Sequence, residues 1–172
     1  MSVIHVVTVC VEIDKDSSET LRLNDKTKTI EVFAADGTEV DFKVFRSTAD
    51  RQILIGGPPC QPFSKNGYWV KNENRLIERD PRNMLSQFLR AVSEAQPNGF
   101  LFENVESLLH PSNKETLRLF LESAESLGYR CTMYRANAAD FGIPQLRKRV
   151  FVFGVRGINA PIPAPKPTHS AK

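Results

Sequence analysis

The sequence predicts an α/β fold built on a mostly parallel β-sheet. Short runs rich in Val, Ile and Phe recur along the chain, and amphipathic helical patterns alternate with them. The length of 172 residues and the hydrophobic content of 41% suit one domain with an ordinary core. Alternating strands and helices are typical of a parallel sheet covered by helices, which binds ligands beyond the carboxyl ends of its strands.

The first third of the chain is expected to hold three strands and one helix. Residues 4–11 are rich in Val and Ile and too short for a membrane helix, so we expect a buried strand there. Residues 14–24 carry a weaker helical pattern. Residues 29–34 and 52–56 fit two further short strands.

The segment "DPRNMLSQFLRAVSEAQ" predicts an amphipathic helix. Asp80 is placed to cap its N-terminus and Pro81 to occupy its first position, where a missing N–H is harmless. The apolar residues at one-face spacing are Leu85, Phe88, Leu89 and Val92.

A second helix is predicted in "SNKETLRLFLESAESLG". Ser112 and Glu115 have the spacing of a capping box, and Gly128 supplies a stop signal. The apolar stripe of this helix consists of Leu117, Phe120, Leu121 and Ala124.

Three more strands and a tail complete the prediction. A strand at 99–102 separates the two helices, and strands at 130–135 and 149–155 follow the second helix. The segment 158–172 is rich in proline, which cannot pair inside a sheet, and is expected to be an extended linker.

Charge and cysteine content narrow the functional classes. The net charge of +3 and the isoelectric point near 8.8 permit a polyanionic partner such as DNA. Three cysteines without CxxC spacing argue against a disulfide framework and against a zinc site, so no metal is expected. The opening residues show neither a signal peptide nor a membrane span. We therefore expect a protein of the reducing cytoplasm, in the prokaryotic cytosol or nucleoid.

Reactive side chains follow two of the predicted strands. Cys60 lies just past the third strand and Glu103 just past the fourth, so the thiol and the carboxylate share one crevice if these strands are neighbours. Period-two alternation puts Arg147 and Arg149 on one face of the last strand. If that strand is antiparallel to the others, both arginines lie at the same edge as Cys60 and Glu103.

Three motifs in order, "GGPPCQPFS", "FENV" and "ANAADFGIPQLRKRVFVFG", resemble the DNA cytosine-5 methyltransferases. They match the nucleophile loop, the Glu-Asn-Val motif and the Gln-x-Arg-x-Arg motif of that family. The resemblance extends from Val11 to about Ser170. It implies a Rossmann-like S-adenosylmethionine-dependent methyltransferase fold, with helices on both faces of a mostly parallel sheet.

The resemblance implies a catalytic role for four residues. Cys60 would add its thiolate to C6 of a cytosine that is rotated out of double-stranded DNA. Glu103 would act as the acid at N3. Arg149 would hold the cytosine O2, and Arg147 would order the pocket through Glu103 or a backbone phosphate. The residues expected to contact the substrate are Pro59, whose carbonyl would accept from the exocyclic amine, Gln61, Ser64, Asn104 and Gln145.

The methyl donor implied by the resemblance is S-adenosyl-L-methionine. Glu12 in "VEIDKDSSETLRLN" would hold its ribose hydroxyls, and Asp36 in "AADGT" would face the adenine amino group. Leu85 in "DPRNML" would pack near the cofactor. The full set of expected cofactor contacts is Glu12, Ile13, Asp36, Gly37, Pro58 and Leu85.

The chain also departs from the family pattern. It contains no Phe-x-Gly-x-Gly loop before Glu12 and no target-recognition region after the proline-rich segment. We therefore expect a fold that is incomplete at the N-terminus, with a partial catalytic domain at 1–157 and a linker towards an absent recognition region at 158–172. Such a chain is either one subunit of a split enzyme, completed by a complementary methyltransferase subunit, or a truncated product.

Other readings of the same residues stay open. The chain could be a catalytically inert remnant or an interaction subunit with weak DNA binding, and binding of labelled S-adenosylmethionine would separate these from an enzyme. A cysteine hydrolase would pair Cys60 with His110 or His169 as the base. An RNA substrate is a third alternative, although the proline before Cys60 fits the DNA family better.

Overall fold

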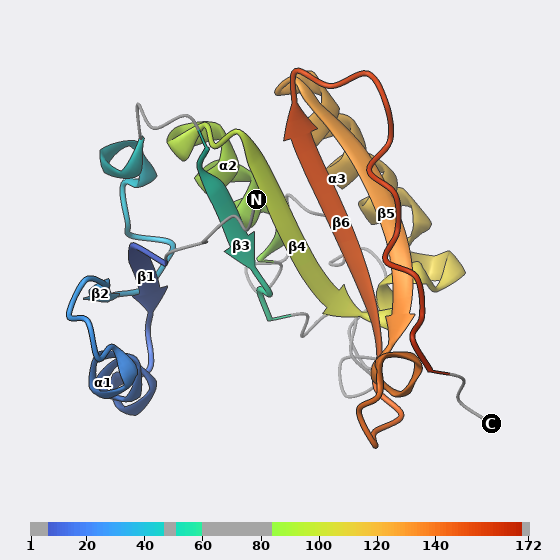
Figure 1. Cartoon of the computed structure of the whole chain (residues 1–172). Coiled ribbons are helices and arrows are strands. Elements are labelled where there is room, and N and C mark those ends of the chain that lie inside the picture. The colour runs from blue at the N-terminus through green and yellow to red at the C-terminus, as the bar shows by residue number, and fades with distance from the viewer. Residues whose placement is uncertain (1–6, 47–50, 60–83, 170–172) are drawn as a thin grey trace. The chain divides into compact units, whose positions relative to one another are not determined.

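The computed structural model describes residues 7–46, 51–59 and 84–169 and separates them into two units, Met1–Asp41 and Phe42–Lys172 (Figure 1). Within these described ranges, no helix is long and apolar enough to cross a membrane.

The first unit is a strand, a helix and a parallel strand. Strand β1 (Val9–Glu12) pairs with β2 (Glu31–Ala34), and helix α1 (Lys15–Asn24) connects them. The Asp14 side chain caps α1 by accepting from Ser17 N at 2.7 Å. This confirms the predicted order of elements, although both strands are shorter than predicted within the described residues.

The second unit holds a four-stranded sheet in the order β3-β4-β6-β5. Strand β3 (Ile53–Gly56) runs parallel to β4 (Gly99–Val105), whereas β6 (Lys148–Arg156) runs antiparallel to both β4 and β5 (Tyr129–Asn137). The sheet is therefore mixed, and the predicted excess of parallel pairs is wrong for this unit. A loop joins β5 to β6 and reverses the direction of the chain, so these two strands pair antiparallel.

Helices α2 (Leu85–Ala95) and α3 (Lys114–Ser126) pack on the same face of this sheet (Figure 1). Their predicted stripes meet the sheet at Phe88 and Phe120, whose rings lie 5.2 Å and 4.7 Å from that of Phe102. The sequence predicted helices on both faces of the sheet. In the described part of this unit, the α-helices cover only one face.

Strand β4 is longer than predicted, and this changes the position of Glu103. The sequence expects the strand to end at Phe102, but Glu103 pairs with Phe151 and Val105 pairs with Arg149. The antiparallel neighbour continues the hydrogen-bond ladder past the point where polar residues begin. Glu103 therefore lies inside β4 and not just beyond it.

The expected start of α3 is also wrong, while its expected stop is confirmed. A 3-10 turn, Pro111–Asn113, leads into α3, and Asn113 makes no side-chain cap bond. The N-cap of α3 is thus Asn113 and not the predicted Ser112, and Glu115 accepts from Arg118 Nε at 2.9 Å. Gly128 ends the helix with φ of 87°, a conformation that favours glycine. The N-cap predicted at Asp80 and Pro81 lies outside the described residues.

The proline-rich segment forms no strand or helix over residues 158–169, yet it is attached to the sheet. Ile162 N donates to Thr132 Oγ1 at 3.1 Å. Farther along, Thr168 N and His169 N both donate to the carbonyl of Asp140. The segment is held along β5 and the loop that follows it, and its role as a linker stays a prediction.

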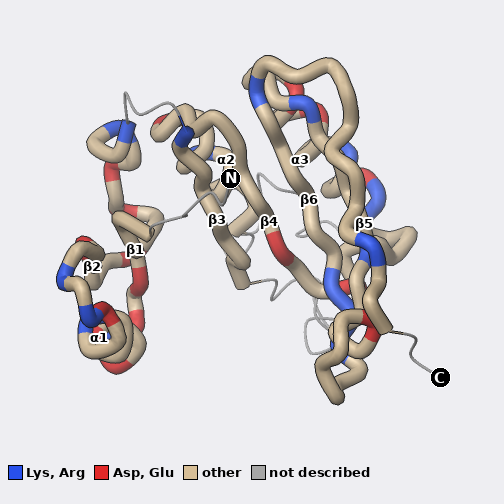
Figure 2. Tube along the Cα trace, viewed as in Figure 1, with Lys and Arg blue, Asp and Glu red and all other residues tan. Residues whose placement is uncertain are grey.

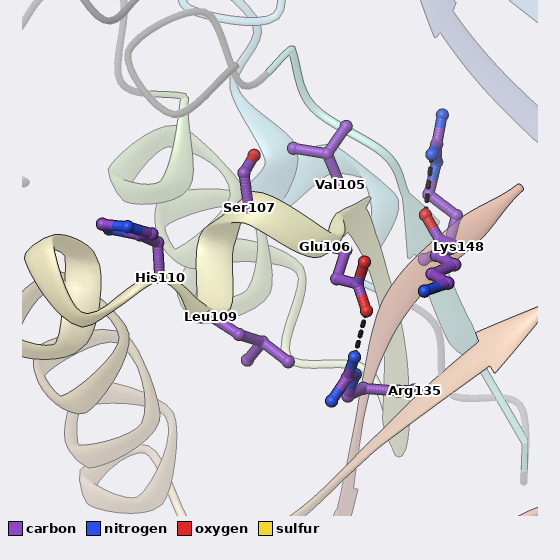
Figure 3. Close-up of a pocket in the computed structure, with 8 residues that line it drawn as sticks. Val105, Glu106, Ser107, Leu109, His110, Arg135 and Lys148 are labelled. Atoms are coloured by element: carbon purple, nitrogen blue, oxygen red, sulfur yellow. Dashed lines mark hydrogen bonds and ion pairs between the residues drawn. The ribbon is translucent and has the colours of Figure 1, made fainter. Parts of the chain in front are cut away.

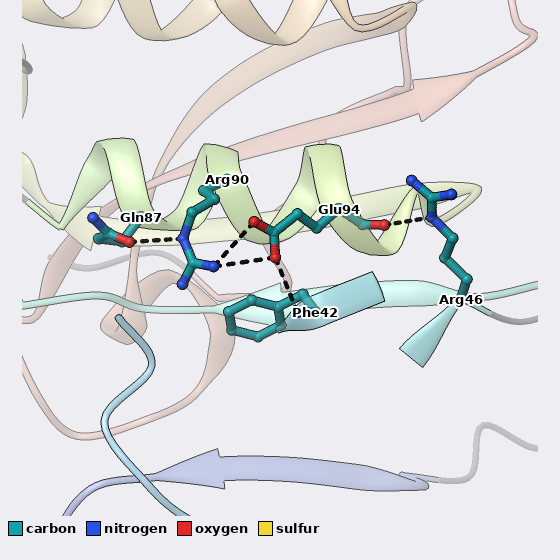
Figure 4. A network of polar contacts seen from close by, with 5 residues as sticks. All are labelled: Phe42, Arg46, Gln87, Arg90 and Glu94. Carbon is teal, nitrogen blue, oxygen red and sulfur yellow. Dashed lines mark hydrogen bonds and ion pairs between the residues drawn. The ribbon is translucent and has the colours of Figure 1, made fainter. Parts of the chain in front are cut away.

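A polar network joins residues 42–46 to α2 (Figure 4). Glu94 accepts from Phe42 N at 2.9 Å and from Arg90 Nη1 at 3.1 Å. The Glu94 carbonyl accepts from Arg46 Nε at 2.6 Å, and the Arg90 guanidinium lies 5.2 Å from the centre of the Phe42 ring. One carboxylate thus connects a helix to the segment that begins the second unit.

We expect Glu94→Ala to lower the free energy of unfolding by about 1–3 kcal/mol, because it removes the acceptor of the Phe42 N–H and one of the acceptors of the Arg90 guanidinium. Thermal unfolding of the purified chain measures the change. Glu122→Ala on α3 is the matched control, since Glu122 also accepts from an arginine four residues earlier but is exposed. Exposed ion pairs contribute little to stability. The prediction would be contradicted if Glu122→Ala lost as much stability as Glu94→Ala.

Candidate active site

The centre of the site is an ion pair between two neighbouring strands. Arg149 Nε on β6 lies 2.8 Å from Glu103 Oε1 on β4, and the two side chains are 22% and 33% exposed. Both lie on the sheet face opposite the helices, because the alternate residues Phe102 and Val150 are buried under the helices. Figure 2 shows the acidic residue of β4 beside the basic residues that begin β6.

The loop after β3 begins against this ion pair. A Cβ atom on Gly57 would lie 3.0 Å from Glu103 Oε2, so glycine lets the loop approach the carboxylate closely. The next residue is anchored as well, because Asn104 Nδ2 donates to the Pro58 carbonyl at 3.3 Å. Asn104 is 3% exposed, and its Oδ1 accepts from Val105 N at 2.8 Å. A buried amide therefore ties the loop to β4.

Three of the predicted residues on this loop, Cys60, Gln61 and Ser64, lie outside the described residues. Pro58 and Pro59 are described and precede Cys60 directly in the sequence. The third and fourth strands, β3 and β4, are neighbours, as the sequence predicted. The start of the predicted nucleophile loop therefore lies next to Glu103, the partner of Arg149.

The other residues of the Gln-x-Arg-x-Arg motif lie in an exposed turn before β6. Gln145 and Arg147 are exposed, and Arg147 N donates to the Gln145 carbonyl at 3.0 Å. The Arg147 carbonyl accepts from Ala138 N, which closes the loop. The partner of Glu103 in the structure is Arg149, whereas the sequence offered Arg147 for that contact.

The expected cofactor residues of the first unit share one edge of its sheet. Glu12 ends β1 and is paired with Ala34, two residues before Asp36, so both carboxylates lie at the carboxyl edge. Glu12 Oε1 accepts from Asp14 N at 2.9 Å. Hydrogen bonds from Thr38 hold the pKa of Asp36 below its ordinary value.

The remaining expected cofactor residues differ in exposure. Ile13 is 66% exposed beside Glu12, and Gly37 follows Asp36 in the chain. In the second unit, Pro58 is half-buried, but Leu85 is 2% exposed within the core. Packing of the core accounts for Leu85 in this structure, and its contact with a cofactor stays a prediction.

Sequence reasoning missed two positions that support site residues. Ser18 is fully buried and its hydroxyl donates to the Glu12 carbonyl at 3.1 Å, which fixes the end of β1. Gly57 was not singled out, although the doubled glycine before two prolines was a usable signal for a close backbone approach.

A pocket of about 560 Å³ opens beside the ends of β4 and β6 (Figure 3). Its polar lining comes from Glu106, Ser107, His110, Arg135, Lys148 and Arg149. No group of three or more metal-ligating side chains occurs in the part of the chain that the structure describes.

Comparison with known proteins gives consistent matches. The family model of the C-5 cytosine-specific DNA methylases matches residues 2–172. The type II methyltransferase M.AquIA of Picosynechococcus sp. is 38% identical, over 94% of this chain and 67% of its own length. M.SacI of Streptomyces achromogenes is 38% identical over 72% of this chain, and the match spans 31% of M.SacI.

Solved structures match as well. A candidate DNA modification methyltransferase encoded within an E. coli prophage matches with a TM-score of 0.67 and 27% identity, over 88% of this chain and 40% of that chain. The S. pombe Dnmt2 methyltransferase matches with a TM-score of 0.64 and 20% identity, over 90% of this chain and 45% of that chain, which shows a shared fold.

Proposed function

The chain belongs to the C-5 cytosine-specific DNA methylase family, and we propose that it carries the catalytic centre of a type II enzyme that methylates cytosine C5 in DNA. The observation that carries this proposal is the Glu103–Arg149 ion pair against the start of the Gly57-Pro58-Pro59-Cys60 loop. A carboxyl group and a cation at one sheet edge, with a cysteine directly following the described start of the loop in the sequence, suit addition to a pyrimidine ring.

Cys60 is the nucleophile in this proposal. Its thiolate forms a bond to C6 of the cytosine, and the electron pair of the C5–C6 double bond moves so that C5 becomes nucleophilic. S-adenosyl-L-methionine supplies the methyl group that C5 takes. Loss of the C5 proton to a base then expels the Cys60 thiolate from C6 and restores the ring. The anchoring of Pro58 by Asn104 supports this role, because it limits the positions open to the residues that follow.

Glu103 and Arg149 act on the polar edge of the base. Addition at C6 builds negative charge on N3, and a proton or hydrogen bond from Glu103 stabilises that charge. The Arg149 guanidinium orients the Glu103 carboxylate through their 2.8 Å contact and presents further N–H donors to the cytosine O2. Arg147 lies in the exposed turn before β6, where it suits contact with a backbone phosphate.

The residues present in the first unit fit the methyl donor. Two carboxylates at the carboxyl edge of a parallel strand pair, Glu12 and Asp36, can accept hydrogen bonds from ribose hydroxyls and an exocyclic amine. Exposed Ile13 offers an apolar surface beside them. Because the chain spans 31% of M.SacI, we propose that turnover also requires a glycine-rich loop and a recognition region, from the same polypeptide or from a second chain.

The test expresses the coding region together with its natural flanking sequence in a bacterial host that lacks DNA methylation. We expect 5-methylcytosine at one fixed sequence of the host DNA, read by bisulfite sequencing. The same locus carrying Cys60→Ala is the matched control and should give none. Methylation confined to cytosine N4 or adenine N6, or no methylation while the protein is expressed and folded, would contradict the proposal and favour an inert or purely DNA-binding chain.

A substitution at Gly57 tests the geometry of the site. Gly57→Ala places a Cβ about 3.0 Å from Glu103 Oε2, and the carboxylate at the end of a flexible side chain must shift. Because a contact of 3.0 Å displaces the carboxylate by only a few tenths of an ångström, we expect a fall of about threefold to tenfold in the single-turnover methylation rate, less than the roughly hundredfold cost of a misplacement of about 1 Å.

A double-mutant cycle with Glu103→Ala separates this effect from general damage. With no carboxylate to displace, Gly57→Ala should not slow the Glu103→Ala enzyme further. If it slows both enzymes equally, Gly57 acts on the loop and not on Glu103.

A further inference from the structure

We propose that the pocket lined by Glu106, Ser107, His110, Arg135 and Lys148, here called the basic pocket, binds one phosphodiester of the DNA backbone near the target cytosine. The inference rests on the proposed function and adds a contact to it. It assigns Arg135 and Lys148, which the sequence analysis did not single out, as residues that position the duplex.

The basic pocket lies at the same sheet edge as the Glu103–Arg149 pair. Lys148 directly precedes Arg149, and Glu106 directly follows Val105, the register partner of Arg149. Arg135 pairs with Val150, whose side chain is buried on the helix face, and Lys148 is two residues before Val150. By strand alternation, Arg135 and Lys148 therefore flank the edge on the side opposite Glu103 and Arg149.

This position suits a long ligand that crosses the edge. Double-stranded DNA carries a negative charge about every 1.7 Å along its axis. A duplex that presents one base to Glu103 and Arg149 must therefore bring phosphates close to the neighbouring cations. The basic pocket, which Arg149 also lines, lies within reach of that backbone.

The charges of the basic pocket match a phosphodiester. Arg149 also lines the pocket, but its charge is matched by Glu103. Of the other lining residues, Arg135 and Lys148 carry two positive charges and Glu106 carries one negative charge, so one positive charge is left. Arg135 Nη2 and Glu106 Oε1 form an ion pair (Figure 3), and this hydrogen bond, with weaker help from Lys148, holds the pKa of Glu106 below its ordinary value. A net charge of one suits a monoanionic diester better than a terminal phosphate, which carries nearly two charges.

The exposure of the lining also favours a polymer backbone over an enclosed small molecule. The Arg135 side chain is 62% exposed and the Glu106 side chain is 33% exposed. Small-molecule sites usually bury most of their ligand, whereas an arginine at an open edge can contact phosphate oxygens through two N–H groups at once. Ser107 and His110 also line the pocket and add polar groups (Figure 3).

The test measures how DNA affinity depends on salt. The protein, expressed with its natural flanking sequence, is titrated against a fluorescent duplex, and anisotropy gives the affinity at several salt concentrations. We expect Arg135→Gln and Lys148→Gln each to weaken binding uniformly across sequences and to lower the slope of log affinity against log salt by about one. Arg130→Gln is the matched control, because it removes the same charge from the other end of β5, where Arg130 pairs with Val155.

Glu106→Gln should change affinity in the opposite direction. It replaces the carboxylate partner of Arg135 with a neutral amide, so more positive charge faces the DNA and binding becomes tighter. Circular dichroism confirms that each variant is folded. If Arg135→Gln and Lys148→Gln behave like Arg130→Gln, the inference is wrong while the proposed function stands. If the wild-type protein, expressed with its natural flanking sequence, is folded but has no DNA affinity at low salt, both are overturned.

Discussion

Cys60→Ala is expected to abolish methyl transfer while leaving cofactor binding nearly unchanged. Loss of the attacking sulfur removes the covalent step, and loss of a nucleophile typically lowers the rate by about a ten-thousandfold to a millionfold. Cofactor binding should survive, because the residues proposed for it include Glu12 and Asp36, which lie in the separate first unit. Transfer of a labelled methyl group to duplex DNA and equilibrium binding of labelled S-adenosyl-L-methionine measure the two properties.

Cys131→Ala is the matched control for this prediction. Cys131 is half-buried against the core, and burial raises the pKa of its thiol to about 11, so almost none of it is thiolate near neutral pH. The control should lose some stability and keep its rate per folded molecule. Near-normal turnover of Cys60→Ala, or an equal loss in both variants, would exclude Cys60 as the nucleophile.

Much of the second unit could be predicted from periodicity because its helices are strongly amphipathic. The stripes around Phe88 and Phe120 identified the faces that pack on the sheet. Strand ends were harder to predict, because the pairing of Glu103 with Phe151 depends on a distant strand that no local pattern reveals. The start of α3 was also hard to predict, because a 3-10 turn, Pro111–Asn113, precedes the helix and moves its N-cap from Ser112 to Asn113.

The sequence predicted the site residues that carry out the chemistry, but it did not predict the residues that position them or the DNA. Glu103 and Arg149 were named from the sequence, and the structure joins them. The choice between Arg149 and Arg147 as partner of Glu103 required the register of β6, which places Arg149 opposite Val105. Arg135 was missed because exposed arginines on edge strands are common and become informative only beside Lys148 in one pocket.

Glu103→Gln is expected to reduce the single-turnover rate by about a hundredfold to a ten-thousandfold, the range typical of losing a general acid. Glutamine keeps the shape and can still donate a hydrogen bond, but it cannot give up a proton as charge develops on N3. DNA affinity should not fall, because the substitution leaves the Arg149 guanidinium without its carboxylate and thus more available to the cytosine O2 or to a phosphate.

The pH profile separates the acid role from a purely structural one. If Glu103 transfers a proton, Glu103→Gln removes one limb of the dependence of rate on pH, and Glu103→Asp keeps that limb at a lower rate. The aspartate is one methylene shorter, so it withdraws from the 2.8 Å contact with Arg149 while keeping its acid. A Gln variant that loses DNA affinity but keeps both its rate at saturating DNA and its pH profile would make Glu103 a positioning residue for Arg149. The proton for N3 would then have to come from another group.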